Sequence, residues 1–204
     1  MKIEEAVKEL RKHEKRKFDQ SIDLIVNLKG VDPKRESLST VITIPHPLKE
    51  KSVCGFFTKK SGVLSTVTQP DFQKYRDKKT LKKLVKQYDF FIAVAPLMPA
   101  VATTFGKVLG PSGKMPSPQL GIVSSEDDAA IKSMLQKINS SVKIRVKEPS
   151  IKVSVGREGM SDEKLIENIK AVYTGIVAML PTKKENVKSA LVKLTMSKPV
   201  GVEL

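Results

Sequence analysis

The stretch PHPLKEK, residues 45–51, decides how the chain is divided. Two prolines lie within three residues and alternating charges follow them, so neither a helix nor a central strand is expected to continue through it. The hydrophobic pattern also differs on its two sides. Apolar and polar residues alternate before the stretch, whereas the apolar runs after it are nearly continuous. We therefore predict a domain boundary here, with a hinge between the domains.

On the N-terminal side of this stretch, the pattern predicts one helix and two half-exposed strands. Apolar residues recur at helical spacing within residues 3–17: Ile3, Ala6, Val7 and Leu10. The segments SIDLIVNL (residues 21–28) and TVITIP (residues 40–45) alternate as strands do. We expect these two strands to form a hairpin whose long loop is the polar segment 30–39.

On the C-terminal side, strands alternate with helices up to residue 140. SVCGFF (residues 52–57) and DFFIAVAP (residues 89–96) have the continuous apolar character of buried strands. Helices are expected at three places, residues 80–88, about 99–107 and 126–138. This alternation predicts an α/β layer.

After NSS, residues 139–141, the alternating pattern returns. VKIRV (residues 142–146) and IKVSVG (residues 151–156) are predicted strands, residues 161–180 a helix, and residues 187–204 one long or two short strands. The two ends of the chain thus share one pattern and the middle has another. The predicted fold class is α/β with two domains: an α+β domain made of residues 1–47 and 141–204, and an inserted α/β domain of residues 48–140.

The charge of the chain indicates a polyanionic partner. The 37 Lys and Arg residues outnumber the 22 Asp and Glu residues, which gives a formal net charge of +15. Both predicted domains share this excess, with net charges of +7 and +8. Nucleic acid is the most common partner of such a chain. The alternative is a lysine-rich proteome in which every protein is basic.

Three basic clusters carry much of this charge: residues 12–17, residues 74–86, and Lys183 with Lys184 and Lys188. Each alone is explained by a solvated surface, but together they favour RNA or DNA as the partner. The chain contains no recognition helix, zinc finger or RNP sequence. No apolar run approaches about 20 residues, so we expect no membrane partner, and charges within the first 18 residues argue against a signal peptide.

The sequence offers no set of residues for catalysis or for a metal. Cys54 is the single cysteine, and His13 and His46 have no acidic neighbours at ligand spacing. Asp127 and Asp128 are adjacent, and we interpret them as residues of a helix's first turn. We therefore expect no catalytic residue, no metal site and no cofactor.

A glycine- and proline-rich segment, FGKVLGPSGKMPSPQ at residues 105–119, raises the question of a phosphate-binding loop. Such a loop needs a glycine where Val108 stands and a hydroxyl where Met115 stands, and it is entered from a strand. Here a predicted helix precedes the segment and prolines interrupt it. The hypothesis left open is an α/β enzyme in which Lys114 clamps the anion of a phosphorylated substrate.

The same segment, extended to FGKVLGPSGKMPSPQLGIV, resembles the signature of the large-subunit ribosomal proteins of the L-one family, archaeal type. Four further segments resemble that family in the same order along the chain: KFDQSIDLIVNL, STVITIPHPL, DFFIAVAPLMP and LTMSKP. The resemblance implies a discontinuous terminal domain and an inserted Rossmann-like domain joined by a hinge. It also implies a cytoplasmic structural protein of the mobile ribosomal stalk that binds large-subunit rRNA and assists release of deacylated tRNA from the exit site. Repression of its own mRNA, and a monomeric state outside the ribosome, are implied as well.

By motif, the resemblance assigns RNA contacts to the terminal domain: Lys17, Phe18, Ser21, Asp23, Lys152, Ser189, Thr195, Met196 and Ser197. Phe18 and Met196 would offer apolar surface to a base or sugar, and the hydroxyls would bond to 2′-hydroxyl groups. Lys17 and Lys152 would meet phosphates. A secondary contact is implied in the signature loop, at Lys107, Gly110, Gly113 and Lys114.

Two positions depart from the family pattern. Ser197 stands where a glycine is usual, which removes access to a positive φ and to close approach of the RNA backbone. Ser112 stands where an arginine is usual, which removes a phosphate contact. For Phe18 and Met196 the alternative role is packing, under the first helix and within the last strand respectively.

Overall fold

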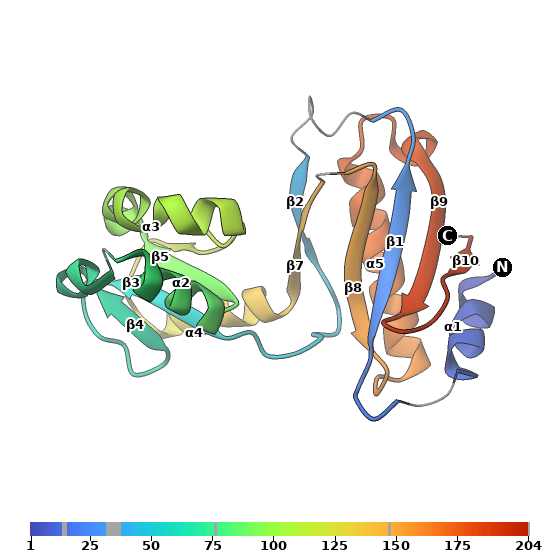
Figure 1. The fold of residues 1–204 in the computed structure, drawn as a ribbon, viewed down its shortest axis with the longest axis horizontal. Coiled ribbons are helices and arrows are strands. Elements are labelled where there is room, and N and C mark those ends of the chain that lie inside the picture. Colours follow the sequence, from blue (N-terminus) through green and yellow to red (C-terminus); the bar gives the residue numbers. More distant parts are fainter. Residues whose placement is uncertain (14–15, 32–37, 76, 147, 204) are drawn as a thin grey trace. The chain divides into compact units, whose positions relative to one another are not determined.

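The computed structural model describes residues 1–13, 16–31, 38–75, 77–146 and 148–203. Most of the predicted polar turn at 30–39, and Lys15 of the first basic cluster, lie outside these residues. The fold divides into two compact units (Figure 1). We call residues Met1–Leu48 with Ser140–Leu204 the terminal unit, and Lys49–Asn139 the inserted unit.

A four-stranded antiparallel sheet forms the centre of the terminal unit. Its strands lie in the order β10-β9-β1-β8, with β1 spanning Ser21–Leu28, β8 Ser150–Arg157, β9 Val187–Leu194 and β10 Val200–Val202. Strand β1 comes from the N-terminal segment and is hydrogen-bonded on both edges to strands from the C-terminal segment. Segments far apart in the sequence therefore lie side by side in one sheet (Figure 1).

Two helices cover one face of this sheet. Helix α1 spans Ile3–Arg11, shorter than the predicted 3–17, and α5 spans Asp162–Met179. Helix α5 ends because Pro181 cannot continue it. The apolar residues of both helices pack on alternate residues of β1: Ile22, Leu24, Val26 and Leu28. The period-2 alternation of β1 thus places one set of side chains in the core and the other set on the opposite face.

The predicted hairpin of residues 21–28 with 40–45 is wrong. Strand β2 (Ser39–Thr43) pairs instead with β7 (Ser141–Arg145) in a separate two-stranded antiparallel sheet. Because β8 and β9 occupy both edges of β1, no edge remains for β2. The β2–β7 pair lies against α5, where a Cβ at Gly175 would come within 2.6 Å of Ile42.

The inserted unit is built on a parallel sheet in the order β4-β3-β5-β6. Its strands are β3 (Val53–Phe57), β4 (Ser65–Thr68), β5 (Phe90–Val94) and β6 (Ile122–Val123). Helices α2 (Lys78–Gln87), α3 (Met98–Ser112) and α4 (Asp128–Asn139) alternate with them, with 3-10 turns at Gln69–Tyr75 and Ala95–Leu97. Every residue of β3 and β5 is buried, as expected for parallel strands covered on both faces.

Aromatic rings fill the core beneath α2 and α3. Phe56 stacks on Phe91 with ring centroids 5.6 Å apart, and it lies 4.8 Å from Phe105. Phe72 meets both Phe56 and Phe105 edge-on. Such offset and edge-to-face pairs are the favoured aromatic geometries, so this cluster stabilises the unit beyond simple burial of area.

The glycine- and proline-rich segment begins inside a helix. Helix α3 continues to Ser112, beyond the predicted end at 107, and it contains Pro111. Proline is tolerated there because residues after it supply the hydrogen bonds of the last turn: the amides of Gly113 and Lys114 donate to the carbonyls of Gly110 and Leu109, respectively. Gly113 ends the helix at a φ of 71°, in the left-handed region that favours glycine.

The predicted α/β fold class is confirmed: the chain combines helices with antiparallel and parallel sheets. The hinge at residues 45–51 stays a prediction. Within the described ranges, no helix has both the length and the apolarity needed to span a membrane.

Candidate nucleic-acid interface

The face of the antiparallel sheet that α1 and α5 leave uncovered is partly accessible and carries mostly polar residues. In Figure 1, α5 passes behind β8 and β1, and the near face of the strands is the uncovered one. We call this the open sheet face. It carries the half-buried or exposed residues that alternate with the core residues: Ser21, Asp23, Ile25 and Asn27 on β1, Ser189, Leu191 and Lys193 on β9, and Ser150, Lys152 and Ser154 on β8.

The centre of the open sheet face is apolar and its surroundings are polar. Ile25 lies directly opposite Leu191, and Asp23 directly opposite Lys193. On the other side of β1, Ile25 lies opposite Lys152. Side chains opposite one another in antiparallel strands are close neighbours, so the surface combines apolar, anionic and cationic groups within a few strands' width.

Two large apolar side chains are exposed at one end of the sheet: Phe18 just before β1 begins, and Met196 just after β9 ends. Phe18 is 51% exposed and Met196 is 65% exposed; with Met1 they are the large exposed hydrophobic residues among those described. The alternative roles in packing, under the first helix for Phe18 and within the last strand for Met196, are therefore wrong. A single exposed apolar residue is common on a protein surface, so what matters here is that both lie at the same end of the sheet.

A buried glutamine, Gln20, ties the Phe18 segment to the Met196 turn. Its side chain is 2% exposed, its Oε1 accepts from the amide of Met196 at 3.2 Å, and its Nε2 donates to Glu158 at 3.3 Å. The Gln20 carbonyl also accepts from the Glu158 amide at 2.9 Å. Both exposed apolar side chains are thus held on one framework. Sequence reasoning missed Gln20, because a single glutamine before a strand carries no distinctive pattern.

A hydroxyl and carboxylate cluster lies beside these two side chains. The Oγ atoms of Ser21 and Thr195 are 3.0 Å apart, and Thr195 Oγ1 accepts from the Ser21 amide at 3.1 Å. The Ser21 hydroxyl donates to Asp23 Oδ1 at 3.2 Å. Because the hydroxyl proton of Ser21 is directed at the carboxylate, the cluster presents mainly oxygen lone pairs to the outside.

The remaining predicted residues of the terminal unit are placed as follows. Ser189 lies on the open sheet face and accepts from Asn27 Nδ2 at 2.9 Å. Lys17 is exposed in the segment before β1, and the exposed Lys152 ammonium lies 4.0 Å from a Glu148 carboxylate oxygen. An ion pair at that distance on the surface is weak, so it does not immobilise the lysine.

Ser197 has a structural role in the turn that carries Met196. Its Oγ accepts from the Leu194 amide at 2.9 Å, and lies 3.1 Å from the Lys198 carbonyl, to which it can donate. Lys183 is the one non-glycine among the described residues with a positive φ, so Ser197 does not need glycine's backbone freedom. The serine closes the turn after β9 with its side chain.

The four predicted residues of the signature loop lie in the inserted unit. The side chain of one of them, Lys114, already makes hydrogen bonds within the protein. Lys107 and Gly110 are exposed on α3, and Gly113 ends that helix. The Lys114 ammonium donates to the carbonyls of Val85 and Tyr88, at 2.8 and 2.7 Å. These carbonyls lie at the C-terminal end of α2, where a cation is favoured. An anion at Lys114 would have to compete with both bonds.

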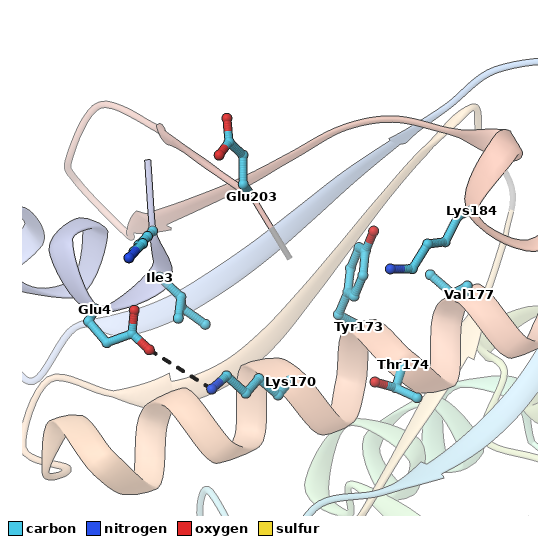
Figure 2. A pocket seen from close by; sticks show the side chains of 9 residues that line it. Ile3, Glu4, Lys170, Tyr173, Thr174, Val177, Lys184 and Glu203 are labelled. Carbon is cyan, nitrogen blue, oxygen red and sulfur yellow. Dashed lines mark ion pairs between the residues drawn. The ribbon is translucent and has the colours of Figure 1, made fainter.

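A pocket of about 480 Å³ lies among α1, α5 and the C-terminal strand (Figure 2). Tyr173 and Val177 give it an apolar wall, and Lys184 lies at its edge. Lys170 faces Glu4 in it at 3.9 Å. Positive and negative side chains are mixed here, so the pocket lacks the single sign of charge that a polyanion site requires.

In the part of the chain that the structure describes, no three His, Cys, Asp or Glu side chains gather in an arrangement that could hold a metal ion. His46 is bonded to Glu167, with Nε2 and Oε2 2.7 Å apart. Its own backbone exchanges bonds with the buried Asn168 side chain, at 3.0 Å from the His46 amide and 2.9 Å to the His46 carbonyl. These contacts stabilise the segment between β2 and the inserted unit.

Comparisons with known proteins agree on one family. The model of the ribosomal protein L1p/L10e family matches residues 10–198. The chain is 38% identical to the large ribosomal subunit protein uL1 of Thermofilum pendens, over 98% of this chain and 92% of that protein. It is 35% identical to the protein of that name from Pyrococcus horikoshii, over 99% and 95% of the two chains, and 34% identical to that from Methanobrevibacter smithii, over 97% of each. The chain therefore belongs to the ribosomal protein L1p/L10e family, whose members are structural ribosomal components and not enzymes.

Proposed function

We propose that the chain is a structural protein of the large ribosomal subunit that acts in the cytoplasm and binds large-subunit rRNA through the open sheet face and the adjoining Phe18 and Met196. The relatives' shared name, large ribosomal subunit protein, supports the first part. The exposure of Phe18 and Met196 on one framework is the observation that carries the second part. The net charge of +15 supports a polyanionic partner.

The chemistry of the interface suits RNA rather than DNA. The Ser21–Asp23–Thr195 cluster presents oxygen acceptors, so it fits a donor such as a 2′-hydroxyl or a base amine. It does not fit a phosphate, because Asp23 would repel that group. RNA carries the 2′-hydroxyl and DNA lacks it, so this cluster would supply discrimination between the two.

The other assigned residues have complementary roles. Phe18 and Met196 provide apolar surface on which a base or a ribose face rests. Lys17 and Lys152 meet phosphates and contribute affinity without sequence preference. In the inserted unit, exposed Lys107 is a candidate for the secondary contact, whereas Lys114 is less suited because it is bonded at the end of α2.

Replacement of the two exposed side chains tests this assignment. We expect Phe18→Ala and Met196→Ala each to weaken binding to large-subunit rRNA of the source organism by about 1–3 kcal/mol. Circular dichroism should show an unchanged fold, because neither side chain is in the core. Tyr173→Ala, an aromatic truncation on α5 away from the open sheet face, is the control and should leave the affinity unchanged; because Tyr173 packs against the core, its fold is checked in the same way. If both site variants bind like the wild type, the interface is wrongly placed.

A second test separates RNA from DNA. An rRNA fragment in which single nucleotides are replaced by 2′-deoxynucleotides should lose affinity at the position that contacts Ser21 and Asp23. In the double variant Ser21→Ala/Asp23→Ala the same replacement should cost nothing further. An equal cost in both proteins would contradict recognition of the 2′-hydroxyl by this cluster.

Two finer roles belong to the same proposal: a position on the mobile stalk, from which the protein assists release of deacylated tRNA from the exit site, and repression of its own mRNA. Resemblance to the family supports both. Ribosomes reconstituted without the protein should release deacylated tRNA more slowly. The leader of its own mRNA should compete with rRNA for one site, and Phe18→Ala should weaken both complexes. The free protein should sediment as a monomer.

A further inference from the structure

Helix α2 of the inserted unit carries a row of exposed lysines along one side. Its sequence, KKTLKKLVKQ, contains five lysines and no acidic residue. Lys79, Lys82, Lys83 and Lys86 are exposed and recur at spacings of three and four residues, so they are neighbours on the helix surface. We call these four residues the lysine stripe. The stripe belongs to the basic cluster 74–86, and the proposed function assigns no role to it.

The core of the inserted unit determines the direction in which the stripe points. Leu81, Leu84 and Val85 are buried and pack in the same apolar cluster as Phe72 and Phe105. At 3.6 residues per turn, the three buried positions lie on the side of α2 opposite to the stripe. Packing of α2 therefore turns all four lysines toward solvent together.

The ammonium groups of the stripe lack neutralising carboxylates. Among the described residues, no ion pair includes any of the four lysines. Two carboxylates that lie near α2 in the sequence are already paired: Asp71 with Lys74 at 2.7 Å, and Asp89 with Lys49 at 3.1 Å. Lys74, a member of the same basic cluster, is therefore left out of the stripe.

This arrangement is unfavourable for the helix alone. Like charges three and four residues apart repel each other, and Lys79 lies in the first turn, where the helix dipole disfavours a cation. Asp77 precedes the helix, and its carboxylate accepts from the Thr80 hydroxyl at 3.3 Å. A bound polyanion relieves the repulsion along the stripe.

The helices of the terminal unit distribute their charges differently. Glu4 of α1 faces Lys170 of α5 at 3.9 Å, and Arg11 of α1 pairs with Asp162 of α5 at 3.0 Å. Those helices mix both signs of charge, whereas α2 keeps a single sign. Its stripe is about 10 Å long, close to the Debye length at physiological ionic strength, so the four charges act together on a polyanion.

The side chains of the stripe suit the phosphate backbone of a double-helical RNA. Lysine ammonium groups are point charges that contact phosphates and carry no sequence information. A single strand is usually held by stacking of its bases on exposed aromatic rings. The large exposed hydrophobic residues among those described, Met1, Phe18 and Met196, all lie in the terminal unit. Double-stranded RNA is bound mainly through its backbone, and rRNA is the polyanion expected for a ribosomal protein family.

We propose that the lysine stripe of α2 is a second RNA-binding surface, which contacts phosphates of a double-helical segment of large-subunit rRNA without reading its sequence. This inference goes beyond the proposed function, which places no contact on α2. It does not depend on what binds the open sheet face.

Footprinting and salt dependence together test the stripe. The protein is the full chain with all four stripe lysines replaced by glutamine, and the probe is large-subunit rRNA of the source organism. In hydroxyl-radical footprinting, the stripe variant should lose protection along one double-helical segment and keep the protection that Phe18→Ala weakens. Each phosphate contact contributes about 0.7 to 0.9 to the slope of log K against log salt, so two to four contacts lower the slope by about 1.4 to 3.6. Circular dichroism confirms the fold of the variant.

A charge-matched control separates the stripe from the net charge. Replacing Lys8, Lys59, Lys132 and Lys164 by glutamine removes the same charge from scattered exposed positions, and should leave the footprint unchanged and alter the slope little. If the stripe variant keeps the wild-type footprint and changes the slope no more than this control, the stripe proposal is overturned.

The remaining outcomes distinguish this proposal from the proposed function and from other partners. If the stripe variant behaves like the wild type while Phe18→Ala weakens binding, the stripe proposal alone fails. If Phe18→Ala and Met196→Ala have no effect while the stripe variant loses its segment of protection, the proposed interface fails and the stripe stands. Weaker binding of deacylated tRNA or of a polyglutamate peptide by the stripe variant, with rRNA binding unchanged, would assign α2 to tRNA or to an acidic protein and overturn the rRNA contact.

Discussion

The two sheets of the molecule use their faces differently. Strand β1 of the terminal unit alternates between half-buried and buried residues along its whole length, whereas all five residues of β5 in the inserted unit are buried. The antiparallel sheet has helices on one face only. The parallel sheet is covered on both, as crossover helices require.

This difference explains where an interface can form. A sheet covered on both faces offers only its ends and the surfaces of its helices, and the Lys114 ammonium near one such end is already bonded to carbonyls of α2. A sheet covered on one face offers a flat surface whose side chains are free of packing constraints. The terminal unit therefore can present a polar and apolar mosaic at no cost to its core, and the inserted unit cannot do so from its sheet.

The largest expected effect tests the doubly covered sheet. Phe91 and Ile92 are adjacent on β5 and neither has measurable exposure. We expect Phe91→Ala to reduce the free energy of unfolding by about 3–5 kcal/mol and Ile92→Ala by about 2–5 kcal/mol. Urea unfolding followed by circular dichroism measures both. A loss below about 1 kcal/mol for either neighbour would show that one face of this sheet is not packed.

Alanine substitutions at two adjacent residues of β1 should, by contrast, reduce the free energy of unfolding by unequal amounts. Leu24 has no measurable exposure, and its neighbour Ile25 is half-buried on the open sheet face. We expect Leu24→Ala to cost about 2–5 kcal/mol and Ile25→Ala about 1 kcal/mol or less. Equal losses in urea unfolding would mean that something packs on the open sheet face in the free protein.

Ionisation of the Cys54 thiol tests whether the parallel sheet of the inserted unit is buried. Burial raises the pKa of Cys54 from 9.0 to about 12. Since the folded state holds the proton more tightly than the unfolded state, stability is lost as pH rises above about 9, by roughly 1 kcal/mol at pH 10. The comparison of wild type with Cys54→Ala isolates this contribution, because other groups titrate equally in both.

The rate of thiol labelling compares a buried position in the parallel sheet with an exposed position beside the antiparallel sheet. Cys54 should react with a thiol reagent only when the chain unfolds, whereas a cysteine placed at Met196, combined with Cys54→Ala, should react in the folded protein. Rapid labelling of Cys54 under native conditions would contradict the sealed interior.

The smallest effect concerns one hydroxyl. Thr195→Val keeps the shape of the side chain but removes an acceptor of the cluster, so rRNA binding should weaken by about 0.5–1.5 kcal/mol. The exposed Thr174 on α5 supplies the control Thr174→Val, which should have no effect. Unchanged binding of both variants would remove Thr195 from the interface.

Much of this fold was predictable from local patterns. The alternation in residues 21–28 and the apolar run in residues 89–96 identified strands of two kinds, and α5 followed its predicted limits within two residues. Strand pairing was not predictable in the same way. The hairpin was wrong because pairing depends on which edges distant segments occupy, and the alternation within a strand carries no such information.

The extent of α3 was missed for a different reason. Glycine and proline predict a loop from residue 108 onward, but the helix accommodates Pro111 in its last turn and stops only at Gly113. The short strands β4 and β6, of four and two residues, were not predicted. Their pairing with β3 and β5 defines them more than their own composition does.

At the candidate interface, residue chemistry was predictable and its arrangement was not. The structure shows that Phe18 and Met196 are exposed and therefore accessible to a partner, and no sequence pattern provides that exposure. The bridge made by Gln20 between the two segments joins positions 176 residues apart. Likewise, Lys143 on β7 and Lys152 on β8 belong to different sheets and line one groove, and only the fold brings them together.

Cross-linking of the protein to its rRNA tests the central claim most directly. After ultraviolet irradiation of the complex and digestion, mass spectrometry identifies the peptides that carry nucleotides. We predict that cross-links concentrate at residues 16–23 and 187–197, with Phe18 and Met196 among the modified positions. Cross-links confined to residues 49–139, or to the outer surfaces of α1 and α5, would contradict the claim that RNA binds the open sheet face.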